Sequence, residues 1–119
     1  DLAHHIAKVA RLRHPERAIP ESLILPFTEM GHVAEKLSIM VAAVITTRDT
    51  EMALQVEKDD DEMDDLHKKV IATIIKDDSG LSLESAIDLT LLGRYYERYA
   101  DHAVSVSRRV YFLVTGKFA

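Results

Sequence analysis

The feature that most constrains the fold of this chain is a helical repeat of apolar residues that continues, with two short breaks, from about residue 22 to residue 115. Apolar side chains recur every three or four positions in three segments, about 22–46, 50–76 and 82–115, which is the spacing of one face of an α-helix. Between Phe27 and Lys76 there is no proline and only one glycine, Gly31. Nothing alternates as a half-buried strand would. The sequence therefore predicts an all-α fold.

Short polar segments separate the three predicted helices. Arg48 and Asp49 form a turn after the first helix, and residues 77–80 (DDSG) form a turn after the second. Ser82 is a residue type that caps helix N-termini, whereas Gly80 and Gly116 suit the position that follows a helix. Because long helices joined by short turns run antiparallel, we expect an antiparallel three-helix bundle over residues 22–119.

The first residues of the chain carry a helical pattern of their own. Residues 1–14 have apolar side chains at helical spacing, and His14 followed by Pro15 would end that helix. We expect residues 15–21, which contain two prolines, to be a connector to the bundle. Because the chain does not begin with methionine, we also expect Asp1 to mark a cut inside a longer protein.

Composition excludes several classes of function. The 119 residues include no cysteine, so disulfides, thiolate metal sites and cysteine nucleophiles are excluded. The net charge of −5 disfavours nucleic-acid binding, which needs a basic face. The longest apolar run, residues 37–45, is too short to cross a bilayer, so no membrane insertion is predicted. No serine, histidine and aspartate stand at a recognisable motif spacing, and we predict that the chain is not an enzyme.

Acidic residues are concentrated in one stretch and recur in pairs at helical spacing. Residues 57–65 hold seven acids and one base, Lys58. On a helical wheel Asp60 and Asp64 lie within about 60° of His67 on the flank of the apolar stripe. Glu97 and Asp101 lie within about 40° of each other and are predicted to turn away from the core. The apolar face of this last helix is predicted to comprise Leu89, Leu92, Tyr96, Tyr99, Ala103, Val106, Val110 and Val114.

Carboxylates four residues apart on a helix repel each other, so these pairs need a positive counter-charge. One interpretation is a solvated acidic face paired with Arg94 and Arg98. The other is a bound cation, because oxygen-rich clusters suit magnesium, manganese, calcium or iron, and a nearby imidazole shifts the preference toward iron or zinc. The sequence leaves both interpretations open.

Two sequence blocks resemble those of a known family. The block GRYYERYADHA (residues 93–103), followed by FLVTG (112–116), resembles the third helix of a PhoU repeat. The acidic block KDDDEMD (58–64) is similar to the family's E(D)-x-x-x-D motif, and DLAHHIAK (1–8) resembles the end of the preceding repeat's third helix, with Asp1 at the motif aspartate. The resemblance implies that the chain is the second of two tandem three-helix repeats, preceded by the last helix of the first.

The resemblance also implies a function. PhoU proteins are regulators of phosphate uptake, and the chain is expected to be a cytoplasmic adaptor that represses phosphate-starvation genes. The implied partners are the ATPase of a phosphate-specific ABC transporter and a membrane-bound sensor histidine kinase. Some family members hold multinuclear iron or zinc clusters, and the ligands here would be Asp60, Asp64, Glu97 and Asp101, with Asp59 as a further candidate. We also expect this chain to associate with itself, as a homodimer.

Two other functions were weighed against this one. A di-iron carboxylate oxidoreductase needs inward-facing Glu-x-x-His motifs, and Glu29 with His32, and Asp64 with His67, have that spacing; the wheel, however, turns Glu29 and His32 away from the core. A helical nucleic-acid binder would use the arginines of the last helix. Glu97 and Asp101, however, lie within the stripe that these arginines form on the helix surface. Its arginines are Arg94, Arg98, Arg108 and Arg109.

Overall fold

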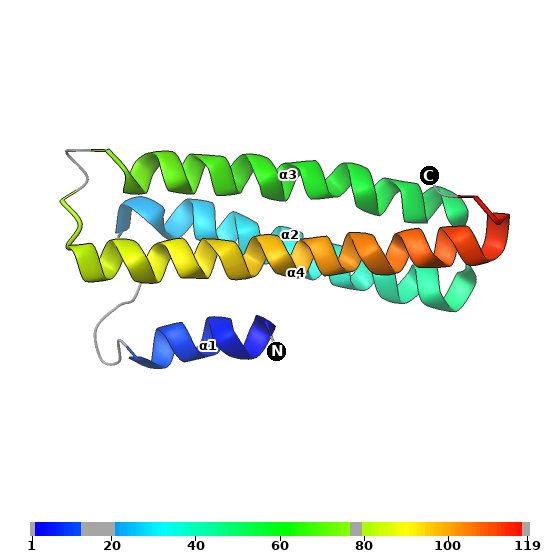
Figure 1. The fold of residues 1–119 in the computed structure, drawn as a ribbon, viewed down its shortest axis with the longest axis horizontal. Helices are drawn as coiled ribbons and strands as arrows, with labels where there is room; N and C mark the ends of the chain where they lie inside the picture. Colours follow the sequence, from blue (N-terminus) through cyan, green and yellow to red (C-terminus); the bar gives the residue numbers. More distant parts are fainter. Residues whose placement is uncertain (1, 13–20, 77–79, 118–119) are drawn as a thin grey trace.

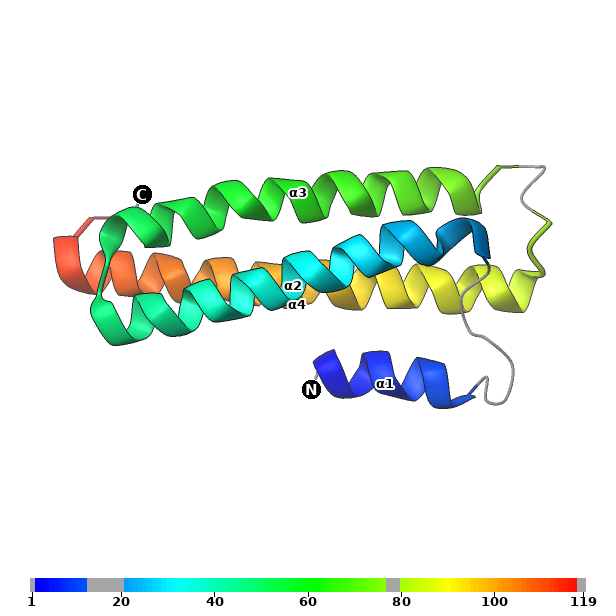
Figure 2. The same ribbon diagram turned by 180° about the vertical axis from the view of Figure 1, so that it is seen from behind.

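The computed structural model describes residues 2–12, 21–76 and 80–117. They form four helices: α1 (Leu2–Leu12), α2 (Glu21–Thr47), α3 (Thr50–Ile74) and α4 (Leu83–Thr115). Helices α2, α3 and α4 run antiparallel as an elongated bundle, and α1 lies along its outside (Figures 1 and 2). The molecule measures 50 × 26 × 18 Å. The predicted all-α three-helix bundle with an additional N-terminal helix is confirmed, and the described residues contain no strand.

The helix boundaries agree with the predicted ones to within two residues. The prediction that Glu21 belongs to the connector is wrong, because α2 begins at this residue. Helix α3 ends at Ile74 rather than at Lys76. The rest of the connector, His14 and Asp1 lie outside the described residues, as do residues 77–79 of the second predicted turn.

Side chains at the helix ends satisfy backbone groups that have no partner within the helix. The carboxylate of Asp49 caps α3 by accepting hydrogen bonds from the backbone N–H groups of Glu51 and Met52. Ser82 caps α4, and Gly116 ends it with φ of 74°, as predicted. Arg48, between α2 and α3, has φ of 60°, so the turn that reverses the chain uses the left-handed region.

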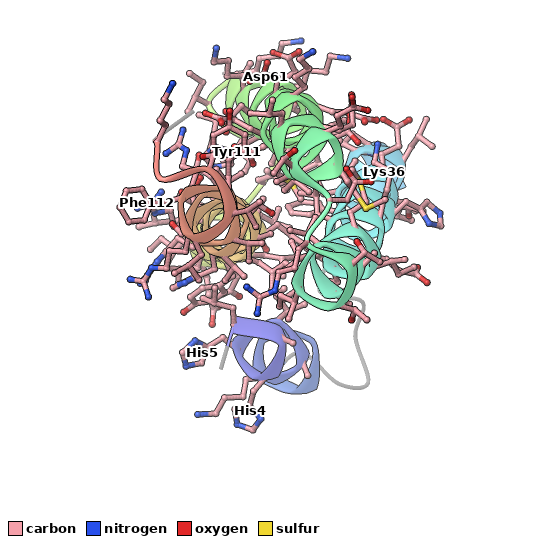
Figure 3. All side chains as sticks on the ribbon, turned by 90° about the vertical axis from the view of Figure 1, so that its right-hand side faces the viewer. His4, His5, Lys36, Asp61, Tyr111 and Phe112 are labelled. Carbon is pink, nitrogen blue, oxygen red and sulfur yellow. The ribbon has the colours of Figure 1, made fainter. Side chains whose placement is uncertain are left out.

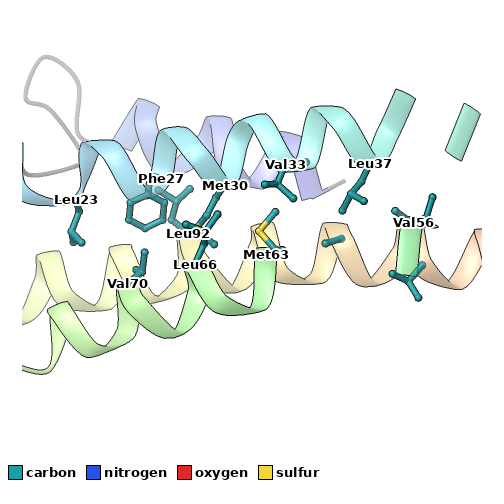
Figure 4. Close-up of a cluster of buried hydrophobic side chains, with 14 of the residues drawn as sticks. Leu23, Phe27, Met30, Val33, Leu37, Val56, Met63, Leu66, Val70 and Leu92 are labelled. Atoms are coloured by element: carbon teal, nitrogen blue, oxygen red, sulfur yellow. The ribbon is translucent and has the colours of Figure 1, made fainter. Parts of the chain in front are cut away.

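The apolar faces of the three long helices meet in one continuous core (Figure 4). Helix α2 contributes Leu23, Met30 and Leu37, all fully buried, and α3 contributes Val56 and Met63 in the same state. Burial of each such side chain stabilises the fold by roughly 1.5–3 kcal/mol. Packing, rather than helix propensity alone, therefore holds these helices together. None of the helices described has a stretch long and apolar enough to cross a membrane.

The buried face of α4 differs from the predicted face. Val106 and Val114 were predicted to be buried but are 36% and 47% exposed, and Tyr96 and Tyr99 are only partly buried. The residues buried in addition are small or short: Gly93, Ala100, Val104 and Ser107. The true face is rotated by roughly 40° toward Glu97, because α4 packs most extensively against α3 and small side chains let the two helices approach closely.

Helix α1 is an accessory to the bundle. Among the described helices it packs only against α4, with Ile6 partly buried against the core. The ring of His5 lies 5.1 Å from that of Tyr95, measured between centroids. Viewed end-on, α1 lies outside the three-helix bundle (Figure 3). Among the α1 residues whose burial is described, residues 2–8, none is fully buried in the core.

Candidate functional site

Four of the predicted site residues come together where α3 packs on α4. Asp60 and Asp64 project from α3, and the charges of Glu97 and Asp101 on α4 act on both of them. Together with His67, which lies one turn beyond Asp64 on α3, these residues are called the acidic seam. The rotation of α4 described above brings Glu97 to this junction. Its side chain is only 20% exposed, so the prediction that it turns away from the core is wrong.

Asp60 is the most perturbed residue of the acidic seam. Burial raises the pKa of its carboxyl group from 3.8 to about 6, and the charges of Asp64, Asp101, Asp61 and Glu97 add to the effect. Its Oδ1 atom is buried and has no hydrogen-bond partner. A buried carboxylate oxygen without a hydrogen-bond donor is costly, and the guanidinium group on which the charge of Asp60 acts, that of Arg108, is bonded to Glu57 instead.

Asp64 is perturbed in the same direction. Burial raises the pKa of its carboxyl group, and the charges of Asp101 and Glu97 raise it further, whereas Lys68 opposes the shift. Excess negative charge is thus shared across the junction rather than confined to one helix.

Glu97, in contrast, already has two partners. The Nδ1 atom of His67 lies 2.7 Å from its Oε2 atom, and Arg94 forms an ion pair with its other oxygen. Gly93 makes room for this contact, because a Cβ atom there would lie 3.2 Å from Cδ2 of His67. The imidazole of His67 therefore lies against the backbone of α4, one turn before Glu97. The spacing of His67 is readable from the sequence, but its pairing with Glu97 depends on how α3 and α4 are placed.

Asp59 lies apart from the acidic seam. Its Oδ1 accepts a hydrogen bond of 2.8 Å from Nε2 of Gln55, and its Oδ2 lies 3.8 Å from Nζ of Lys36 on α2. Adjacent residues on a helix point about 100° apart. Asp59 therefore lies at the junction of α3 with α2, and Asp60 lies at the junction of α3 with α4.

The donor types of the acidic seam suit a cation, but the geometry is not that of a formed metal centre. Within the described ranges, no group of three or more aspartate, glutamate or histidine side chains is placed to hold a metal ion. Four carboxylates and one imidazole nonetheless form a donor set that fits oxygen-preferring metals and iron or zinc. The unpartnered oxygen of Asp60 is where such an ion would relieve an existing cost.

The residues of the two alternative functions are arranged differently. Glu29 and His32 are exposed on α2, so they cannot project into the bundle, and the di-iron arrangement is wrong for this fold. Arg94 pairs with Glu97, and Arg108 pairs with Glu57. Two of the four arginines proposed for nucleic-acid contact are thus engaged with acids of the same chain.

The fold and the site together define the class of this protein: an antiparallel helical bundle that carries paired carboxylates at a helix junction near its surface. Comparison with known proteins agrees with this class. The family model of the PhoU domain matches residues 27–110, and the chain belongs to the PhoU family. No solved structure matches the chain.

Curated relatives match nearly the whole chain. It is 46% identical over 117 residues to the phosphate-specific transport system accessory protein PhoU homolog 2 of Mycobacterium tuberculosis, covering 98% of this chain and 55% of the relative. It is 45% identical to PhoU homolog 1 of Mycobacterium leprae, covering 98% and 53%. The PhoU homolog of Zymomonas mobilis is 31% identical, with coverage of 98% and 49%. The chain thus spans about half the length of these relatives.

Proposed function

We propose that this chain is a regulatory module of phosphate uptake. The observation that carries the proposal is the 46% identity, over nearly the whole chain, to a phosphate-specific transport system accessory protein. In this proposal the protein acts in the cytoplasm, as an adaptor between the ATPase of a phosphate-specific ABC transporter and a membrane-bound sensor histidine kinase. It would keep phosphate-starvation genes repressed when phosphate is abundant.

Binding measurements test the adaptor role. The purified protein would be titrated by calorimetry with the isolated ATPase subunit and with the cytoplasmic part of the kinase, each at high and low phosphate. We expect saturable binding to both proteins. Failure to bind either of them at any phosphate concentration would refute the adaptor role.

We further propose that the acidic seam holds iron or zinc. Asp60, Asp64, Glu97 and Asp101 would supply carboxylate oxygens, and Asp59 would join them only after breaking its contacts with Gln55 and Lys36. The unpartnered oxygen and raised pKa of Asp60 support the proposal. The bound ion would offset the excess negative charge of the acidic seam, while the protein's own part is to gather the four carboxylates.

Elemental analysis of the purified protein tests the metal site. We expect iron or zinc in the parent protein and its loss in Asp60→Ala and Glu97→Ala, with the helical circular-dichroism signal retained. Asp65→Ala is the matched control, because Asp65 is an exposed acid on the same helix outside the acidic seam. Absence of metal from the parent, or equal loss in the control, would contradict the proposal.

The position of the chain within a longer protein is also a proposal. The chain spans about half of its relatives, and a helix lies beside the bundle without completing it. We propose that α1 is the last helix of a preceding repeat and that the bundle is the second. Without that repeat, exposed apolar residues such as Ile45 and Leu113 would drive the 119-residue chain to form dimers. Light scattering that shows a stable monomer at micromolar concentration would contradict the self-association.

A further inference from the structure

Glu97 is the one glutamate among the four proposed carboxylate ligands, and both of its oxygens already have partners. Nδ1 of His67, on α3, lies 2.7 Å from its Oε2 atom, and the guanidinium group of Arg94 pairs with its Oε1 atom. A glutamate side chain has one more rotatable bond than an aspartate, so it loses more conformational freedom when it is fixed on a cation. These two bonds already restrict Glu97, so less freedom remains to be lost on binding.

The two partners of Glu97 do not hold it equally. The side chain of Arg94 is 55% exposed and lies on the same helix as Glu97, and water and salt screen an ion pair of this kind. The side chain of His67 is only 18% exposed and belongs to the neighbouring helix. Its bond therefore fixes Glu97 relative to α3, the helix that carries Asp60 and Asp64.

The imidazole ring of His67 is itself fixed in orientation. Its far edge lies against the backbone of α4 at Gly93, where a Cβ atom would come within 3.2 Å of Cδ2 and 3.6 Å of Nε2. Nδ1 faces Glu97 and Nε2 faces this backbone, so neither nitrogen is directed toward the aspartates of the acidic seam. His67 is therefore placed to act on Glu97 rather than to bind a cation, although its spacing from Asp64 is that of a ligand pair.

We propose that His67 is a positioning residue of the acidic seam: its Nδ1–H group holds the carboxylate of Glu97 in place for a cation without binding the cation itself. This inference rests on the proposal that the seam holds iron or zinc, and it adds which residue prepares the seam for the ion. A carboxylate oxygen that accepts one hydrogen bond keeps a second lone pair for a metal. Partners that orient a metal ligand in this way typically account for about 10–100-fold in affinity.

Two substitutions of the same shape test this role. His67→Asn keeps a donor, because the amide nitrogen of asparagine is as many bonds from the backbone as Nδ1 of histidine. His67→Leu has the same branching at Cγ and no donor. His32→Leu is the matched control, because His32 is an exposed histidine on α2. The affinity of each protein for zinc, and for ferrous iron under anaerobic conditions, would be measured by competition with a chelator, and circular dichroism would confirm the helical fold.

We expect His67→Leu to weaken binding about 10–100-fold, His67→Asn to restore most of the affinity, and His32→Leu to leave it unchanged. Nitrogen NMR of the zinc-loaded parent should show Nδ1 of His67 still protonated. Equal affinity of the parent and His67→Leu would refute the positioning role alone, as would equal losses in His67→Asn and His67→Leu. Loss of the Nδ1 proton on zinc binding would show that His67 is a ligand and would also overturn the proposal. A parent protein that binds neither metal would refute the metal site and this inference with it.

Discussion

At the scale of single residues, Asp60 shows how a side chain on the edge of a core can be left without a partner. Its neighbour Asp59 is satisfied by Gln55 and Lys36, and Glu97 is satisfied by His67 and Arg94. Asp60 has one oxygen without a hydrogen bond and is surrounded by like charges. The cost falls on this residue because the nearby guanidinium groups of Arg94 and Arg108 bond to Glu97 and Glu57 instead.

The raised pKa of Asp60 predicts a pH-dependent effect on stability. The pKa is about 6 in the folded protein against an ordinary 3.8, so the favourable contribution of the protonated carboxyl is complete below pH 3.8 and is lost as pH rises through 6. Asp60→Asn should therefore raise the free energy of unfolding at neutral pH by about 1 kcal/mol, allowing for solvent screening. The gain in free energy of unfolding should disappear near pH 4, close to the ordinary pKa of 3.8. Urea unfolding with a chelator present measures both values.

The same substitution separates the two interpretations of the acidic seam. If iron or zinc binds there, adding the metal should stabilise the parent protein and not Asp60→Asn. The parent would then have the higher free energy of unfolding, whereas with chelator Asp60→Asn has the higher one. If Asp60→Asn is less stable than the parent even with chelator, the carboxylate of Asp60 has a stabilising partner, and the prediction is contradicted.

At the scale of helices, the junction of α3 and α4 depends on small residues. Gly93, Ala100 and Ser107 are buried along α4, and they let α3 come close enough for His67 to reach Glu97. The predicted face left out all three of these residues, and Val104 with them. The predicted face of α4 was consequently rotated away from the real one, and Glu97 was placed too far from the core.

Gly93→Ala should affect stability differently in the parent protein and in His67→Ala. Alanine favours a helix by about 1 kcal/mol over glycine, but its Cβ atom would lie 3.2 Å from the imidazole of His67. In the parent protein we expect Gly93→Ala to give no gain, because the imidazole must shift and weaken its bond to Glu97. In His67→Ala the same change should stabilise by about 1 kcal/mol. Thermal unfolding of the four proteins measures the difference, and equal gains in both backgrounds would contradict the contact.

At the scale of the whole molecule, the three long helices are a unit and α1 is an addition to it. Among the residues whose burial the structure describes, every member of the buried core belongs to α2, α3 or α4, whereas Ile6 of α1 is only partly buried against it. Beside α1, an apolar groove lined by α2 and α4 lies open at the surface of the bundle.

Removal of residues 1–20 should therefore leave the bundle folded. We expect the loss in free energy of unfolding to be about 1–2 kcal/mol, the contribution of partly buried aliphatic side chains such as Leu2 and Ile6. Circular dichroism should show a helical protein with a cooperative transition. A shortened chain without that transition would show that α1 is part of the cooperative core.

Local patterns determined most of the fold. The spacing of apolar residues located all four helices, and residue types at their ends located the caps of α4 at Ser82 and Gly116, because helix periodicity and capping are properties of neighbouring residues. The pairs Asp60 with Asp64 and Glu97 with Asp101 were readable for the same reason, since each lies within one turn of one helix.

The tertiary structure decided how these elements face each other. Only the packing of α3 on α4 brings the two acidic pairs together and places His67 on Glu97, and only the packing of α2 beside α4 forms the groove. Rotation of a helix about its axis depends on the partners it packs against, and a change of roughly 40° moves a side chain from solvent to a helix junction. The sequence by itself determined which residues share a helix face, and the assembled bundle determined which faces meet.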